Sequence, residues 1–519
     1  MQVRRLVPVL AVSVLATLIP TAAGAATERA AGAPVTDPLR PFTQQRPDFA
    51  RCGPGTPADF ECATVRVPLD YRAPGGDTLG IAVSRIKAAD PAARRGVLLT
   101  NPGGPGGPGL EIPLDLSELL PGSVKDRYDL IGFDPRGVGR SAPVGCGLTD
   151  EEKPWPRHSD RTTFDASERW ARTVADKCRT AERKTLRHIT TRNTARDMDI
   201  IRAALGEKRI SYLGYSYGTY LGAVYTQMFP RRADRFILDS AVDPAQVWRQ
   251  FFRGWAPESE KAFHRWARWT ARHHDRYALG RTAAEVSRTF HDLMRRADRE
   301  PVTIGGVRYD GVALRAILRA PFFTPVVAAD AVATVRDASA GRATSSALLA
   351  PEYPSDNELS SVWAILCGDV AWERDPARYR ADSLRDAARY PVYGDFAAGI
   401  TPCAHWDRPV EPVTRVSNHV KALIVQNEWD SQTPLALGQG MRRALKGARM
   451  VTVDEGEGHG VYGYGTSECA ERAGTAYLTT GRLPAKDLNC DVNPAPAGSD
   501  PGGRSGPRKV PGPLGVGPR

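Results

Sequence analysis

The chain has 519 residues, of which 41% are hydrophobic and 25% are charged, and it carries a net charge of +11. These proportions are ordinary for a globular protein and exclude wholesale disorder, and the length allows one large domain with an inserted or second domain. The positive charge does not favour nucleic-acid binding, because the arginines are interleaved with Asp and Glu and form no long basic run.

The N-terminus has the organisation of a secretory signal peptide. Arg4 and Arg5 precede an apolar run that ends near Pro20, and the small residues 23–25 follow it. This order predicts a signal peptide over residues 1–25, cleaved near Ala25, and a secreted protein without a stable membrane anchor. Residues 26–48 are rich in Ala, Thr, Pro and Arg without apolar periodicity, so we expect a leader or propeptide-like arm there.

Eight cysteines are expected to form disulfides in an exported protein. Eight cysteines allow about 105 connectivities, but pairing in sequence order closes the shortest loops and is therefore favoured. The expected pairs are Cys52 with Cys62, Cys146 with Cys178, Cys367 with Cys403, and Cys469 with Cys490. No cysteine or histidine cluster has the spacing of a zinc site, and we expect neither a metal nor a cofactor.

The first half of the chain alternates predicted strands and helices. Residues 60–68 and 78–86 predict two strands joined by a long turn, and the apolar runs 96–100 and 128–133 predict two buried strands. Residues 194–205 have helical apolar spacing, and Thr194 is the expected N-cap, with Asp197 in the first turn. The strand at 209–213, the helix at 219–229 and the strand at 235–239 continue this pattern. It predicts an α/β fold with a mostly parallel, doubly wound sheet.

The alternation stops between about residues 242 and 407. This region is helical in pattern and rich in tryptophan, and Phe263, Trp266 and Ala267 lie at the spacing of a buried helix face. A structureless connection of this length is implausible, so we expect a helical lid over 243–407, inserted into a core formed by 49–242 and 408–492. Strands at 421–426 and 448–453 and a helix at 468–479 complete the core, and the Pro- and Gly-rich residues 493–519 are expected to be disordered.

Residues 213–219 (LGYSYGT) contain a G-x-S-x-G motif between the strand at 209–213 and the helix that follows it. This context is that of a nucleophile elbow, in which a strained turn exposes a serine at the edge of the sheet. Ser216 is therefore the predicted nucleophile. A serine hydroxyl needs an imidazole to take its proton and a carboxylate to orient that imidazole.

The base and the acid are expected after the lid, in the order Ser, acid, His. His459 follows the last predicted core strand in a glycine-rich loop, whereas His419 precedes a strand and lies at its wrong end. Asp430 follows the preceding strand and is the favoured acid. Glu428 is the second choice, and Asp454 and Glu455 are weaker candidates.

The glycine-rich loop after the strand at 96–100 is expected to supply an oxyanion donor. We assign this role to the backbone N–H of Gly104, together with the N–H of Tyr217. Residues 104–109 also match G-x-G-x-x-G, the pattern of dinucleotide-binding turns. That interpretation is disfavoured because two prolines remove N–H groups and the loop follows a third strand instead of opening the fold.

Together these motifs resemble the secreted tripeptidyl-aminopeptidase family of actinobacteria, relatives of proline iminopeptidases within the α/β-hydrolases. The matching segments are 101–106 (NPGGPG), 134–141 (DPRGVGRS), 214–219 (GYSYGT), 430–434 (DSQTP) and 458–460 (GHG). The resemblance covers residues 50–490 or so, and it implies an α/β-hydrolase that releases short peptides through Ser216, Asp430 and His459. Proline iminopeptidases have a histidine where this chain has Pro102, so any role of that histidine is absent.

The expected substrate is a peptide with a free N-terminus, whose ammonium requires a carboxylate in the pocket. Asp369, Glu258 and Glu260 could serve, but a solvated or structural role is favoured for each, so none is assigned to the site. A carboxylesterase acting on small esters is the main alternative, because the same triad hydrolyses esters and amides. A catalytically silent binding protein is a third hypothesis, which the complete triad disfavours.

Overall fold

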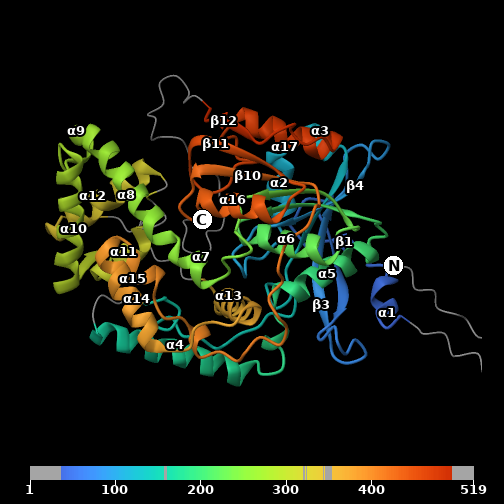
Figure 1. The fold of residues 1–519 in the computed structure, drawn as a ribbon, viewed down its shortest axis with the longest axis horizontal. Coiled ribbons are helices and arrows are strands. Elements are labelled where there is room, and N and C mark those ends of the chain that lie inside the picture. Colours follow the sequence, from blue (N-terminus) through green and yellow to red (C-terminus); the bar gives the residue numbers. More distant parts are fainter. Residues whose placement is uncertain are drawn as a thin grey trace, which may run out of the picture. The chain divides into compact units, whose positions relative to one another are not determined.

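A ten-stranded sheet forms the centre of the computed structural model, which describes residues 37–156, 161–318, 322, 324–342, 344 and 354–493 (Figure 1). In spatial order the strands are β1 (Ala50–Arg51), β2 (Glu61–Pro68), β3 (Thr78–Ile86), β5 (Tyr128–Phe133), β4 (Gly96–Asn101), β6 (Ile210–Tyr215), β7 (Ala233–Asp239), β10 (Ala422–Trp429), β11 (Arg449–Glu457) and β12 (Leu488–Asp491). Strands β1, β2, β3 and β5 pair antiparallel, and every pair from β5 to β12 is parallel. The predicted hairpin and mostly parallel sheet are confirmed.

Helices cover both faces of the sheet, as a doubly wound fold requires. Helices α2 (Ile112–Leu119), α3 (Gly122–Lys125) and α17 (Glu468–Thr480) pack on one face. Helices α1 (Arg40–Thr43), α5 (Thr191–Ala204), α6 (Tyr217–Met228) and α16 (Leu435–Ala444) pack on the other. Strands β4, β5 and β6 are buried along their whole length because both faces are covered.

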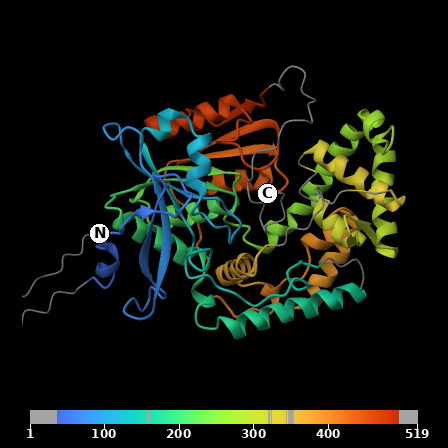
Figure 2. The ribbon, with the colours of Figure 1, turned by 180° about the vertical axis from the view of Figure 1, so that it is seen from behind.

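The described residues between β7 and β10, the segment for which the sequence predicted a lid, are mostly helical, and we refer to this region as the lid (Figure 2). Its helices are α7 (Arg249–Arg253), α8 (Trp255–Arg272), α9 (His274–Tyr277), α10 (Ala283–Arg299), α11 (Gly311–Leu318), α12 (Pro325–Ser339), α13 (Asp356–Asp369), α14 (Pro376–Arg389) and α15 (Gly394–Ala397), followed by the short 3₁₀ turn η3 (Pro402–Ala404). The residues Phe263, Trp266 and Ala267 are buried, which confirms the inward face of α8.

The lid contains two features that the sequence did not predict. A small antiparallel hairpin, β8 (Val302–Ile304) and β9 (Val307–Tyr309), lies among its helices. The long helix α4 (Arg161–Ala181) also belongs to it, although it precedes the elbow in the chain. Its side chains Phe164 and Ala171 share a buried cluster with Tyr379 of α14 and Ala404 of η3. Two separate chain segments therefore build the lid.

Two expectations about local structure were wrong. The N-cap of α5 is Thr190, whose hydroxyl accepts a hydrogen bond from Asn193 N, and Thr194 lies inside the helix. Asp197 lies beyond the first turn, because α5 begins at Thr191, and it pairs with the fully buried Arg136. The folded part also begins before residue 49: Phe42 of α1 is buried in the main core, so the expected arm extends at most to the residues ahead of α1.

The four predicted disulfides are confirmed: Cys52–Cys62, Cys146–Cys178, Cys367–Cys403 and Cys469–Cys490. The predicted signal peptide, residues 26–36 of the expected arm, and the tail from residue 494 lie outside the described residues. Among the helices that are described, none has the length and apolar character needed to span a bilayer.

Candidate active site

Ser216 occupies the turn between β6 and α6. Its backbone has φ 56° and ψ −124°, a strained conformation outside the helix and strand regions, and α6 begins at the next residue. Gly218 is required here because a β-carbon at this position would lie 2.8 Å from Asn101 Oδ1 and 2.9 Å from Asn101 O. The chain therefore makes the predicted elbow, with Ser216 at its tip.

Asp430 and His459 come together in the loops that follow β10 and β11. The distance from His459 Nδ1 to Asp430 Oδ2 is 2.7 Å, and both side chains are buried. Of the carboxylates that the sequence suggested, only Asp430 makes this contact: Glu428 instead accepts a hydrogen bond from Glu455 N at 2.8 Å. This pairing leaves His459 Nε2 as the ring nitrogen available for chemistry.

The Asp430 carboxylate is fixed by donors from its own loop. Oδ1 accepts hydrogen bonds from Gln432 N (2.8 Å) and Thr433 N (3.0 Å), and Oδ2 accepts one from Thr433 Oγ1 (2.7 Å). Together these three hydrogen bonds fix the carboxylate so that its Oδ2 faces His459. Sequence reasoning did not identify Thr433, although its position three residues after Asp430 is typical of such a turn.

Asp239 and Ser240, at the end of β7, connect the elbow to the His459 loop and were missed at the sequence level. Ser216 N donates to Asp239 O (2.9 Å), and Gly460 N donates to Ser240 Oγ (2.8 Å). The Asp239 carboxylate accepts hydrogen bonds from Val461 N (3.1 Å) and from Tyr462 N (2.6 Å). Burial raises the pKa of Asp239 to about 7. Polar residues at the carboxyl end of a parallel strand were the available signal.

Ser216 Oγ and His459 Nε2 are both buried, and neither has a hydrogen-bond partner among the described residues. Unpaired buried polar atoms are costly, and a catalytic role is one of the explanations for them. A serine hydroxyl and an imidazole nitrogen without partners are the two groups that exchange a proton in serine hydrolysis. The elbow that carries Ser216 and the loop that carries His459 are joined through Asp239.

The glycine-rich loop after β4 lies against the elbow. A β-carbon on Gly103, whose φ is +102°, would lie 2.6 Å from Tyr215 O and 2.9 Å from Ser216 Cβ. Gly103 N donates to Asn101 Oδ1 (3.1 Å), so this N–H is already engaged. The next backbone N–H in the loop is that of Gly104. Tyr217 is the first residue of α6, where backbone N–H groups have no partner within the helix. The loop and the helix terminus thus meet beside Ser216.

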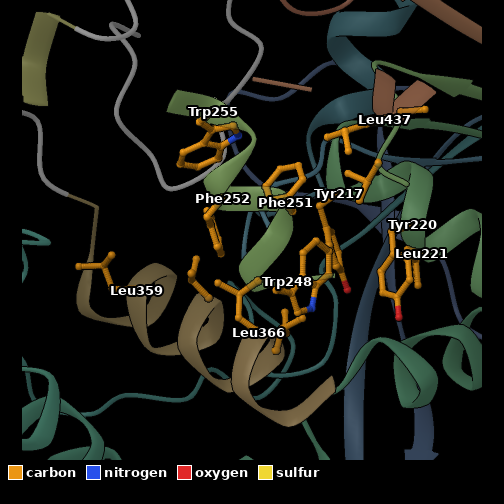
Figure 3. Packing of buried hydrophobic residues seen from close by; sticks show 14 of the residues in the cluster. Tyr217, Tyr220, Leu221, Trp248, Phe251, Phe252, Trp255, Leu359, Leu366 and Leu437 are labelled. Atoms are coloured by element: carbon orange, nitrogen blue, oxygen red, sulfur yellow. The ribbon is translucent and has the colours of Figure 1, made fainter. Parts of the chain in front are cut away.

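A closely packed apolar cluster adjoins these two residues, and the lid contributes to it (Figure 3). The core supplies part of the cluster, and the segment leading into α7, helix α7 and helix α13 supply the rest. Its residues are Gly104, Pro105, Tyr217, Val242, Trp248, Phe251, Phe252 and Leu366. No charged side chain belongs to it among the described residues, and the space between its residues does not hold a water-sized molecule. We refer to these residues as the lid–core cluster.

The three carboxylates considered for substrate ammonium binding are engaged elsewhere. Asp369 is buried and accepts hydrogen bonds from Thr191, Glu258 pairs with Lys261 at 2.7 Å, and Glu260 accepts one from Val392 N at 3.1 Å. None of them belongs to the lid–core cluster. In the part of the chain that the structure describes, no group of three or more His, Cys, Asp or Glu side chains could hold a metal ion.

Comparison with known proteins identifies relatives of similar sequence. Residues 390–490 match the family model described as TAP-like protein. The chain is 34% identical to the tripeptidyl aminopeptidase of Streptomyces lividans, over 85% of each chain. It is 30% identical to serine protease Hip1 of Mycobacterium tuberculosis, over 84% of this chain and 88% of the relative, and 30% identical to carboxylesterase B of the same species, over 91% and 94%.

Proposed function

The chain belongs to the tripeptidyl aminopeptidase family of α/β-hydrolases, which are serine hydrolases, and we propose that it releases short peptides from the free N-termini of polypeptides. The observation that carries this proposal is the hydrogen-bonded pair of Asp430 and His459, with Nε2 of His459 and the hydroxyl of Ser216 both unpartnered on segments that Asp239 joins. Relatives named as a tripeptidyl aminopeptidase and a serine protease support the peptide substrate.

In this mechanism Ser216 Oγ attacks the scissile carbonyl while His459 Nε2 takes the hydroxyl proton. Asp430 holds the imidazole tautomer and stabilises the imidazolium. The N–H groups of Gly104 and Tyr217 stabilise the oxyanion. His459 then donates the proton to the leaving amine. Water then attacks the acyl-enzyme carbonyl while His459 takes its proton. His459 returns that proton to Ser216 Oγ as the acyl group leaves as a carboxylic acid.

Three substrates test the peptidase activity. The purified enzyme is given a tripeptidyl arylamide with a free N-terminus, the same compound with an acetylated N-terminus, and a short-chain aryl ester. We expect cleavage of the free arylamide and loss of most of that activity on acetylation. Cleavage of the ester alone would reject the peptidase and support the alternative, a carboxylesterase, which the relative named carboxylesterase B favours.

The variant Ser216→Ala tests the nucleophile. We expect kcat to fall by at least about 10⁴-fold with an unchanged thermal unfolding midpoint, because the hydroxyl makes no hydrogen bond in the described structure. Residual turnover near the wild-type rate would refute the assignment.

We further propose that the protein is secreted and works outside the cytoplasm. Four disulfides support this, because such bonds persist in oxidising compartments. N-terminal sequencing of the protein recovered from culture medium tests it. Recovery of the enzyme only from the cytoplasm, with free thiols, would contradict it.

A further inference from the structure

A cavity of about 290 Å³ lies where the end of α4, the end of α13 and the loop after η3 meet. None of the described residues that line it belongs to the candidate active site or to the lid–core cluster. Its volume is at the lower end of the range for small-molecule sites. The charged side chains that line it are Arg179, Arg183, Arg187, Arg408 and Asp407. We refer to it as the arginine cavity.

Most of the positive charge in the arginine cavity has no counter-charge. Arg179 is the exception, because its Nε lies 3.3 Å from Asp407 Oδ1 and its Nη2 donates to His405 O at 2.7 Å. The other three arginines are exposed, and within the described parts of the chain their side chains make no hydrogen bond or ion pair. Like charges that share one concave site repel one another and attract anions from solution. The charge of the cavity therefore favours an anionic ligand.

The walls of the arginine cavity are fixed by covalent bonds. The disulfide Cys146–Cys178 anchors α4 one residue before Arg179. The disulfide Cys367–Cys403 joins the end of α13 to the start of the loop that contributes residues 406–410. The hydrogen bond from Arg179 to His405 O links α4 to the same loop. Because these walls are held in place before a ligand arrives, binding costs less ordering of the chain.

The rest of the lining is mostly apolar. Ala175, Leu186 and Trp406 line the cavity and are buried, and Pro409 and Val410 line it and are half-buried. An apolar group placed against these side chains is removed from water, whereas a hydrated inorganic ion gains nothing from them. The lining is therefore suited to a ligand that has an apolar body and an anionic end.

We propose that the arginine cavity binds a small organic anion, in which an apolar body carries carboxylate or phosphate groups. The planar guanidinium group donates two parallel hydrogen bonds to either kind of oxyanion. The anionic end accepts hydrogen bonds from Arg183, Arg187 and Arg408, and the apolar body packs against Trp406 and Val410. This site is separate from the candidate active site, so the proposal does not depend on the peptidase function.

Isothermal titration calorimetry of the purified enzyme tests the ligand class. The probes are phenyl phosphate, phthalate, inorganic phosphate and benzyl alcohol, and the first two distinguish a phosphate ligand from a carboxylate ligand. We expect saturable binding of one phenyl phosphate or phthalate per chain, about tenfold weaker binding of inorganic phosphate, and none of benzyl alcohol. Equal affinity for inorganic and phenyl phosphate, or no saturable binding of either organic anion, would overturn the proposal.

Variants of the lining locate the bound anion. Arg183→Gln, Arg187→Gln and Arg408→Gln should each raise the Kd of the organic anion about tenfold, because each removes hydrogen bonds from a charged donor. The matched control is Arg443→Gln, an exposed arginine of α16 that does not line the cavity, and it should change the Kd by less than about twofold. An equal loss of affinity in all four variants would indicate nonspecific attraction to a basic protein, and the proposal would be wrong.

Val410→Trp tests the cavity independently of its charge. The larger side chain fills space in the arginine cavity and leaves all four arginines in place, so we expect binding of the organic anion to be lost. Thermal unfolding of each variant checks that the fold is retained. Wild-type affinity in Val410→Trp would show that the anion binds on the outer surface, which contradicts a site inside the cavity.

Discussion

At the scale of single residues, the active site depends on side chains that never contact the substrate. Asp239 is one of them, because its carboxylate holds Val461 N and Tyr462 N and thereby the loop that carries His459. It is buried, and its pKa is raised from 3.8 to about 7. The raised value means that folding penalises the ionised form.

This penalty predicts a pH dependence of stability. Between pH 4 and 7 the folded protein holds a proton on Asp239 that the unfolded chain has released, so this residue lowers the free energy of unfolding as the pH rises. Asp239→Asn removes this contribution. We therefore expect the difference in unfolding free energy, variant minus wild type, to increase from pH 4 to pH 7 in chemical denaturation. A constant difference across that range would contradict the raised pKa.

A second single-residue prediction concerns Arg136, in the segment 134–141. Its guanidinium is fully buried and donates to Asp197 at 2.6 Å and to the carbonyl oxygens of Pro68 and Leu69. Arg136→Met leaves the Asp197 carboxylate buried without its main counter-charge, so we expect a loss of about 3–5 kcal/mol in unfolding free energy. The exposed Arg443→Met is the control, with an expected change within about 0.5 kcal/mol. Equal effects would show that the ion pair is dispensable.

At the scale of elements, helix α8 of the lid is attached to both loops that carry the acid and the base. Arg265 pairs with Glu457 at 3.1 Å, two residues before His459. Its guanidinium also lies 4.7 Å from the ring centroid of Trp429, the neighbour of Asp430. At the start of the helix, Trp255 Nε1 donates to Gln432 O at 2.7 Å. The lid therefore steadies the catalytic loops as well as covering them.

Removing this attachment should affect turnover more than substrate binding. Arg265→Met leaves the half-buried Glu457 without its cation and removes the contact with Trp429, so we expect kcat to fall about tenfold with little change in KM. Arg265→Lys keeps a charge and should recover part of the loss. Arg268→Met, exposed on the same helix, should behave as wild type. An equal loss of kcat in both Met variants would indicate a general effect on α8 instead.

The elements also show what the sequence could and could not predict. Buried runs such as β4 and β6 were found because hydrophobic runs flanked by glycine are a local signal. Helix α4 was not assigned to the lid, because only tertiary contacts with Tyr379 and Ala404 place it there. The sequence predicted Thr194 instead of Thr190 as the N-cap of α5 because two threonines have the same capping propensity. The ion pair between Arg136 and Asp197 is a tertiary contact that local sequence does not reveal.

The same limit applies to the site. Ser216, Asp430 and His459 lie directly after strands of a parallel sheet, where chain order predicts reactive groups. The residues that orient them, Asp239 and Thr433, act through hydrogen bonds that span the ends of neighbouring strands or close a turn. The lid–core cluster could not be predicted, since its residues come from three parts of the chain, near 104, between 217 and 252, and at 366.

At the scale of the whole molecule, the disulfides divide between the sheet domain and the lid. Cys146–Cys178 and Cys367–Cys403 fasten lid segments, with sequence separations of 32 and 36 residues, whereas Cys52–Cys62 closes a loop of 10. Cross-linking a longer loop restricts the unfolded chain more. The lid should therefore depend on its disulfides more than the N-terminal hairpin does.

This difference is measurable by thermal unfolding. Cys367→Ser with Cys403→Ser should lower the free energy of unfolding by about 3–4 kcal/mol, and Cys52→Ser with Cys62→Ser by a smaller amount. The double variant Cys52→Ser with Cys62→Ser should also keep the wild-type kcat. The reverse order of stability would indicate that the lid is held chiefly by its noncovalent contacts.

A lid fastened in this way also acts as a filter on the physical state of a substrate. Disulfides, Asp369 and Arg265 hold it at several separate points, and the lid–core cluster packs lid residues against the core. A peptide segment that is still part of a folded domain cannot enter beneath the lid, because the folded domain is too large to go with it. Two substrate proteins with the same N-terminal sequence should then be cleaved at very different rates. The rate should depend on how often each N-terminus unfolds locally and becomes exposed to solvent.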